Sequence, residues 1–208
     1  LMVFCSSFGQ TFFIGVFTPS IEQHFSLSHS EWGSIFMIGT ILSALILPLT
    51  GSFLDRVPLK KYALCVSSLL AVACFSAGMA NNVLLLVFAV FLLRQAGQGL
   101  ATHTSLTAIL KHFGDHKGKA LALTGVGFPL GRAILPITAI FFITSIGWQE
   151  TYILCGFLVL VCMVPATLIL VNPKPTIAPN KLNEGLPSAE LLKDGSSVTL
   201  KKALRAPL

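Results

Sequence analysis

The stretch Gly51–Lys61, GSFLDRVPLKK, decides the fold, because it sets four charged side chains between two long apolar runs. Asp55 and Arg56 are adjacent, and Lys60 and Lys61 follow within a few residues. Basic residues in the short loops of helical membrane proteins collect on the cytoplasmic side. A charged cluster at that surface also supplies ion pairs that hold or release a helix bundle during a conformational change. We therefore predict a cytoplasmic connection between two membrane-spanning helices.

The composition is typical of a membrane protein. Of the 208 residues, 54% are hydrophobic and only 11% are charged, whereas a soluble domain has about 25% charged residues. The formal net charge of +6 does not indicate a nucleic-acid partner, because the basic residues lie mainly in short segments between or after apolar runs. The cysteines have no disulfide or metal-binding spacing. All five lie within apolar runs: Cys5, Cys65, Cys74, Cys155 and Cys162.

Six apolar runs approach the roughly 20 residues that cross a bilayer. They are residues 1–18, 32–53, 62–80, 84–108, 119–143 and 151–171. We expect an all-α membrane domain over residues 1–171. The segment 172–208, with prolines among Asn, Ser and Gly, is predicted to be a cytoplasmic linker.

The first run begins at Leu1 without a preceding Met or a flanking charge. We therefore expect the chain to be a fragment. A cleaved signal peptide is the alternative interpretation of residues 1–18, but a basic first region and a small-residue cleavage motif are missing.

The distribution of Lys and Arg gives an orientation. The connections at 19–31, 81–82 and 147–150 contain neither residue. All Lys and Arg outside the spans lie in the loops 55–61 and 111–119 or in the tail 172–208, which we therefore predict to be cytoplasmic. Trp32 and Trp148 fall at the opposite boundary, where indole rings favour the interface. A plasma membrane, or a bacterial inner membrane, is the expected location.

The pattern G-x-x-x-D-R-x-x-x-K-K of residues 51–61 resembles the signature loop between the second and third helices of the major facilitator superfamily of transporters. Pro58 stands where that loop usually has a second Gly. The resemblance implies the amino-terminal half of a twelve-helix fold, with six helices arranged as two three-helix inverted repeats. It also implies a missing second half, which rocks against the first about a midplane site.

Two arginines are predicted to lie near the middle of the membrane. At a rise of 1.5 Å per residue, Arg94 in the fourth run and Arg132 in the fifth are far from either surface. A charged side chain there costs at least about 2.5–3.5 kcal/mol, and the six runs contain no mid-span Asp or Glu. A carboxylate solute would suit both, because guanidinium binds it with two parallel hydrogen bonds. Bonds to backbone carbonyls, or to a carboxylate in the missing half, are the alternative for each.

Residues 94–99, RQAGQG, resemble an Arg-Gln-Gly motif of the superfamily, shifted by one residue. Arg94 and Gln98 are four residues apart and share a helix face. In the superfamily the first and fourth helices line the central cavity, so the resemblance makes Gln10, Thr11, Arg94 and Gln98 the candidate substrate-binding residues. Ordinary hydrogen bonds to a neighbouring helix are the alternative for the polar residues.

The fifth run carries small residues at helix-contact spacing. Gly127-x-x-x-Gly131 lets two backbones approach closely. Together with Gly118 these glycines partly match a motif of the superfamily's antiporters, but Arg132 replaces the expected Pro, so antiport is not inferred. Pro129 predicts a bend that moves with the transport cycle.

The sequence lacks a catalytic triad, a P-loop and a metal-ligand cluster, so we expect neither an enzyme nor a cofactor or metal. We predict secondary active transport of a small solute, with an organic anion favoured. His103 is a candidate proton site, and a hydrogen-bonded helix contact is its alternative. Other functions stay open: efflux of drugs or metabolites by antiport, a non-transporting membrane sensor, or a membrane enzyme, which would need clustered His, Asp or Glu.

Overall fold

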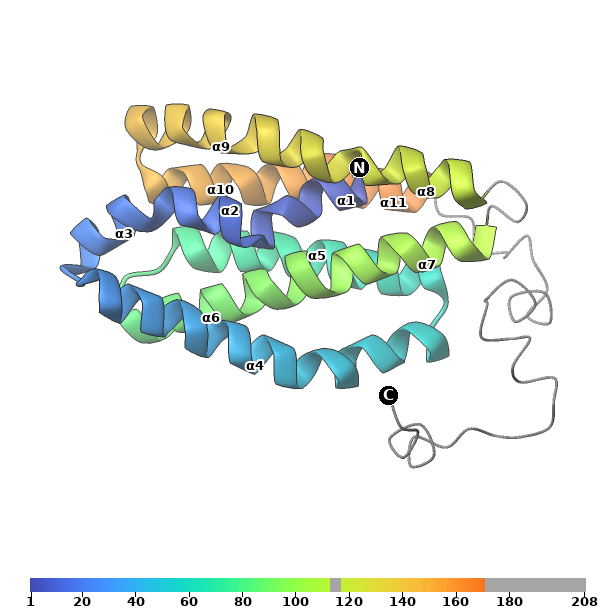
Figure 1. Ribbon diagram of the computed structural model, residues 1–208, viewed down its shortest axis with the longest axis horizontal. Coiled ribbons are helices and arrows are strands. Elements are labelled where there is room, and N and C mark those ends of the chain that lie inside the picture. The colour runs from blue at the N-terminus through green and yellow to red at the C-terminus, as the bar shows by residue number, and fades with distance from the viewer. Residues whose placement is uncertain (113–116, 171–208) are drawn as a thin grey trace, which may run out of the picture.

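The computed structural model describes residues 1–112 and 117–170, except for the side chains of residues 55, 56, 111, 112, 117 and 170. Every regular element in these two ranges is helical, and the helices run along the long axis of the molecule (Figure 1). Five helices are long and apolar enough to cross a membrane, and a sixth span results if one bent pair is counted as one. The predicted all-α membrane fold is confirmed.

Five of the spans follow the predicted runs closely. The second is α4 (His29–Arg56) and the third is α5 (Leu59–Gly78). The fourth consists of α6 (Val83–Leu93), a π-helical segment η3 (Arg94–Ala101) and α7 (Thr102–His112). The fifth consists of α8 (Lys117–Gly125) and α9 (Gly127–Ile146). The sixth consists of α10 (Trp148–Leu158), a π-helical η5 (Val159–Met163) and α11 (Val164–Leu170).

The first span is broken, and it extends beyond residue 18, where the apolar run was predicted to end. Its first part is α1 (Met2–Cys5) followed by η1 (Ser6–Gly9). Its second part is α2 (Thr11–Ile14), η2 (Gly15–Phe17) and α3 (Thr18–Phe25). Gln10 between them is extended, with φ −85° and ψ 151°, and the two parts meet at a bend of 53°.

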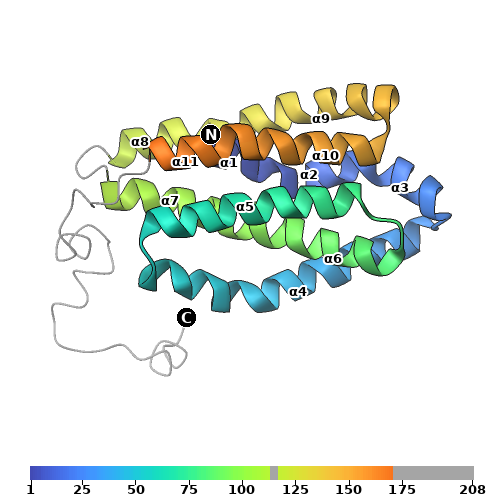
Figure 2. The same ribbon diagram turned by 180° about the vertical axis from the view of Figure 1, so that it is seen from behind.

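The spans form two layers. Figure 1 looks onto α9, the first span, α6 with α7, and α4, while Figure 2 shows α5 and the sixth span on the opposite side. The α5 and α10 helices of the rear layer pack against each other. Gly78 of α5 permits this contact, because a Cβ there would lie 2.6 Å from the carbonyl oxygen of Gln149.

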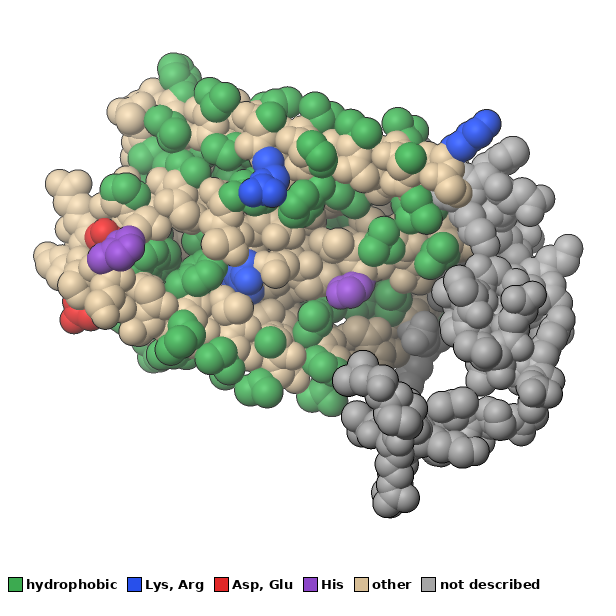
Figure 3. Space-filling model, viewed as in Figure 1, with side chains coloured by type: hydrophobic (Ala, Val, Ile, Leu, Met, Phe, Trp, Pro, Cys, Tyr) green, Lys and Arg blue, Asp and Glu red, His purple; other side chains and the backbone are tan. Residues whose placement is uncertain are grey.

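The core is rich in aromatic side chains where the first and sixth spans meet. Phe17 stacks on Tyr152 with ring centroids 4.0 Å apart, and Phe13 meets Phe17 at 5.2 Å. All three rings are fully buried. The periphery is apolar as well, since large side chains such as Leu123 and Phe141 are exposed and hydrophobic groups cover much of the molecule (Figure 3). A helical bundle with an apolar exterior suits a lipid environment.

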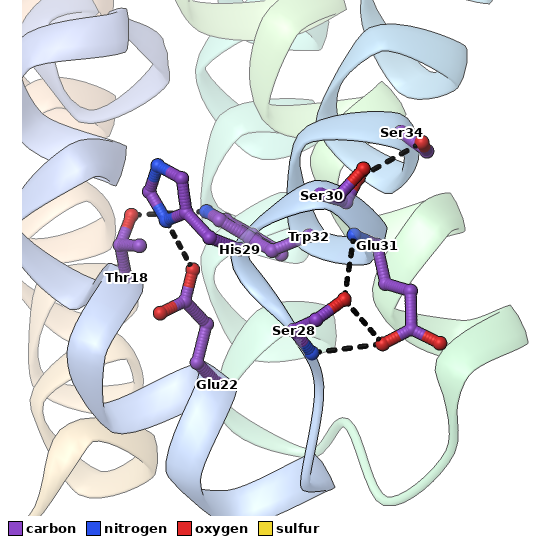
Figure 4. A network of polar contacts seen from close by, with 8 residues as sticks. All are labelled: Thr18, Glu22, Ser28, His29, Ser30, Glu31, Trp32 and Ser34. Atoms are coloured by element: carbon purple, nitrogen blue, oxygen red, sulfur yellow. Dashed lines mark hydrogen bonds and ion pairs between the residues drawn. The ribbon is translucent and has the colours of Figure 1, made fainter.

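A polar network holds together the end of α3 and the start of α4 (Figure 4). Ser28 and Glu31 form a capping box at the start of α4, which satisfies otherwise unpaired backbone N–H groups. The indole Nε1 of Trp32 donates to Thr18 Oγ1 at 2.9 Å. His29 Nδ1 lies 2.8 Å from Glu22 Oε1, although the imidazole is largely exposed. The sharp turn between the two spans is thus fixed by side chains from both.

The Gly51–Lys61 stretch is mostly helical rather than a loop. The α4 helix continues to Arg56, α5 begins at Leu59, and only Val57 and Pro58 connect them. Tyr62 reinforces the turn, because its hydroxyl donates to the carbonyl of Thr50 at 3.0 Å. The charged cluster predicted to supply ion pairs includes Asp55 and Arg56, whose side chains lie outside the described set. Most of the loop 111–119 and the linker 172–208 lie outside it as well.

The connections alternate between the two ends of the bundle. The links α3–α4, α5–α6 and α9–α10 gather at one end, and the link α4–α5 lies at the other (Figures 1 and 2). The described lysines Lys60, Lys61 and Lys119 belong to elements that meet at this second end. The arrangement therefore separates the connections without basic residues from those that carry them.

We predict that the end carrying the lysines is cytoplasmic. In a cysteine-free background, a single Cys at Asn81 should react with a membrane-impermeant maleimide added outside intact cells. A single Cys at Lys119 should react only after the cells are opened. The two positions are both exposed, so the reverse labelling pattern would mean that the orientation is wrong.

Candidate substrate site

The break in the first span lies where its backbone touches the fourth span. A Cβ on Gly9 would lie 2.0 Å from the carbonyl oxygen of Leu93 and 2.8 Å from the Cα of Gly97. A Cβ on Gly97 would in turn lie 2.6 Å from the Cα of Gly9. No larger residue fits either position without moving a backbone. This contact brings the chain around Gln10 directly onto the π-helical segment η3.

Arg94, the first residue of η3, reaches across this contact. Its Nη1 donates to Thr11 Oγ1 at 3.1 Å and to the carbonyl of Gly9 at 3.4 Å. The side chain is 7% exposed. The extended conformation of Gln10 interrupts the helix, and the carbonyls just before such an interruption lose their usual partners. Arg94 therefore supplies a donor to a carbonyl at the helix break, and this carbonyl supplies an acceptor to the buried guanidinium.

The charge of Arg94 is only partly compensated. Its guanidinium carbon lies 5.2 Å from the centre of the Phe36 ring of α4, a distance suited to a cation–π interaction. Its Nε is buried and donates to no acceptor in the described residues. Among the described side chains, the only carboxylates, Glu22, Glu31 and Glu150, lie outside the spans or at their ends. A buried guanidinium with a free donor can bind an anion.

The other candidates on the first and fourth spans lie around this arginine. Thr11 contacts it directly and is exposed. Gln10 is half-buried at the break itself, and Gln98 is exposed on η3. The backbone nitrogen of Gln98 would lie 3.0 Å from a Cβ on Gly9. The structure thus brings the four predicted residues of the first and fourth spans to one helix break.

Arg132 approaches the same segment from α9. Its guanidinium carbon lies 5.3 Å from the centre of the Phe12 ring, and the side chain is exposed. Gly131 beside it is buried against the first span, where a Cβ would lie 2.2 Å from Ser7 Oγ. Gly127 faces the same span, where a Cβ would lie 3.4 Å from the backbone nitrogen of Phe4. The two glycines therefore set α9 close to the first span. Val126 interrupts the fifth span three residues before Pro129.

His103 is not part of this group. It is exposed on α7 and makes no described contact with Arg94 or Arg132. Its role as a proton site stays a prediction. Within residues 1–112 and 117–170, no three His, Cys, Asp or Glu side chains are arranged to hold a metal ion.

Gln95 is a residue that sequence reasoning missed. It is 2% exposed, and its amide joins two residues of α4. Ser43 Oγ donates to Gln95 Oε1 at 2.9 Å, and Gln95 Nε2 donates to Thr50 Oγ1 at 2.6 Å. The Arg-Gln pair at residues 94–95 was the available signal. Gln95 fixes the rotation of η3 against α4 and so helps to aim Arg94 at the first span.

We expect Gln95→Leu to destabilise the bundle. Each lost interhelical hydrogen bond costs on average about 0.6 kcal/mol, and at most about 1.7, so the two together predict roughly 1–3 kcal/mol. The measurement is Tm in detergent. Gln98→Leu is the matched control, because Gln98 is exposed and makes no described side-chain hydrogen bond. Equal Tm values for the two variants would contradict the structural role inferred for Gln95.

The comparisons with known proteins agree with this architecture. The family model of the Major Facilitator Superfamily matches residues 1–208. The chain is 27% identical to bovine monocarboxylate transporter 1 over 176 residues, which are 83% of this chain and 34% of the relative. It is 22% identical to human monocarboxylate transporter 6 over 156 residues, 75% of this chain and 31% of the relative. The chain therefore spans about a third of the length of these curated relatives.

Proposed function

The chain belongs to the Major Facilitator Superfamily, and we propose that it forms the amino-terminal six-helix part of a transporter for a small organic carboxylate. Residues 1–171 are the bundle in this proposal, and 172–208 connect it to a second half. The complete protein alternates between outward-open and inward-open states around a midplane site. The site lies at the break of the first span, in a multi-pass protein of the plasma membrane.

The proposal rests mainly on the surroundings of the Arg94 side chain. The guanidinium is buried near the middle of its span, has a donor without a described partner, and has no described carboxylate beside it. A cation in a site of low dielectric binds an anion more strongly than it does in water. A carboxylate supplies both the opposite charge and the acceptor geometry that a guanidinium requires.

The similarity to monocarboxylate transporters supports the same substrate class. The identity is low, so the similarity supports a carboxylate in general rather than one particular acid. Membership in a transporter family also favours a carrier over a membrane enzyme.

The experiment compares three solutes of one shape in vesicles that contain the complete protein. The probes are radiolabelled propionate, propionamide and propylammonium, with protein-free vesicles as the measure of passive permeation. We expect saturable, protein-dependent uptake of propionate alone. Uptake of propylammonium or propionamide without propionate would overturn the carboxylate proposal.

The alternatives appear as distinct outcomes of the same assay. Propionate uptake that requires a solute preloaded inside the vesicles indicates antiport. Propionate that raises the Tm of the protein but is not taken up indicates a sensor on a transporter fold.

A further inference from the structure

Arg132 is an exposed cation at the centre of a membrane span. It lies at the midpoint of the span Gly118–Ile146, and no ion pair involves it among the described side chains. A guanidinium at this depth is too costly to leave against lipid. Figure 3 shows basic side chains in the middle of the face formed by α9, the first span and α7, away from both ends of the bundle. We therefore expect the part of this face around Arg132 to meet a polar space rather than the bilayer.

Arg94 and Arg132 contact consecutive residues of the broken helix. Arg94 donates to Thr11 from one side, and Arg132 covers the ring of Phe12 from the other. Consecutive Cα atoms are only about 3.8 Å apart, so both guanidiniums flank one turn of α2. Thr11 is exposed between them, which leaves that turn open to a solute.

The middle of this face carries two positive charges and no negative one among the described side chains. The described acidic side chains lie at or next to the connections between spans: Glu22, Glu31 and Glu150. One monocarboxylate would neutralise one guanidinium and leave the other uncompensated. A solute with a second carboxylate neutralises both and offers each guanidinium its preferred acceptor.

We infer that the site recognises a small dicarboxylate, with one carboxylate bound by Arg94 and the other by Arg132. The inference rests on the proposed carboxylate transport and specifies its substrate class. Arg94 is the buried anchor, and Arg132 is the exposed residue that distinguishes two carboxylates from one. The Phe12 ring holds the Arg132 guanidinium in position through the cation–π contact.

The test measures how well unlabelled acids compete with the uptake of radiolabelled propionate in vesicles containing the complete protein. Malonate, succinate, glutarate and adipate are each compared with the monoamide of the same length, which keeps one carboxylate and replaces the other by a neutral group. One length should show a dicarboxylate preference of at least about tenfold, because a hydrogen bond to a charged group contributes about 1.5–3 kcal/mol and 1.4 kcal/mol is tenfold.

Arg132→Gln should abolish this preference, because it should lower the affinity for the dicarboxylate far more than the affinity for the monoamide. Phe12→Leu is the control for the ring, and it should weaken the preference without removing it. Equal competition by dicarboxylates and monoamides in the wild type would overturn the inference but leave carboxylate transport standing. So would an Arg132→Gln variant that loses affinity for both equally. The absence of competition by any carboxylate would overturn the proposed function as well.

Discussion

Arg94→Ala is expected to abolish most carboxylate uptake. The variant loses the guanidinium that donates to Thr11 and to the carbonyl of Gly9, and with it the proposed anion contact. Since a hydrogen bond to a charged group contributes about 1.5–3 kcal/mol, apparent affinity should fall roughly 10- to 150-fold. Arg94→Lys should fall between the wild type and Arg94→Ala, because lysine keeps the charge and loses the planar pair of donors. Initial uptake rates over a range of carboxylate concentrations measure the apparent affinity of each variant.

Two further variants separate charge from packing. Arg94→Gln retains amide donors for the Gly9 carbonyl but has no charge, so its uptake should resemble that of Arg94→Ala even if its Tm is higher. Thr11→Val removes the Oγ1 acceptor and keeps the shape, and it should reduce affinity less than any change at Arg94. Wild-type affinity in a folded Arg94→Ala protein would make Arg94 a structural residue only.

The fold was predictable because bilayer thickness and charge placement constrain it strongly. Runs of apolar residues predicted all six spans, and the charged stretch after Gly51 separated the second from the third. The ends of the helices were less well predicted. Polar caps such as Ser28 with Glu31 extend α4 beyond its apolar part, and Gly51–Arg56 continues the helix where the charges indicated a loop.

The break at Gln10 was not predictable from local sequence. Neither Gly9 nor Gln10 is a strong helix breaker in a membrane, and the break coincides with a contact between Gly9 and a residue 88 positions away, Gly97. The grouping of Arg94 with Thr11 depends on that contact. The resemblance to a family pointed to the first and fourth spans, which the structure places in contact, while the sequence itself identified only two unpaired cations. The two buried hydrogen bonds of Gln95 to α4 were not predictable either, because they depend on how η3 is rotated against α4.

Gly97→Ala is expected to damage both stability and transport. The new Cβ would lie 2.6 Å from the Cα of Gly9 and 2.7 Å from its nitrogen, and neither backbone atom can rotate away as a side chain can. Overpacking of this kind typically costs about 1–3 kcal/mol. The two spans must separate, which lengthens the bonds from Arg94 to Gly9 and Thr11, so uptake should fall along with Tm.

Gly15→Ala is the matched control for this contact, because it lies in the same broken span and a Cβ there would meet nothing within 4 Å. Alanine has the higher helix propensity by about 1 kcal/mol, so this variant should be as stable as the wild type or slightly more stable. Its uptake should be unchanged. If Gly97→Ala behaved like Gly15→Ala in both Tm and uptake, close backbone contact would not be needed to hold Arg94 at the helix break. The proposed site would then rest on the hydrogen bonds from Arg94 to Gly9 and Thr11 alone, without the backbone packing of Gly9 on Gly97.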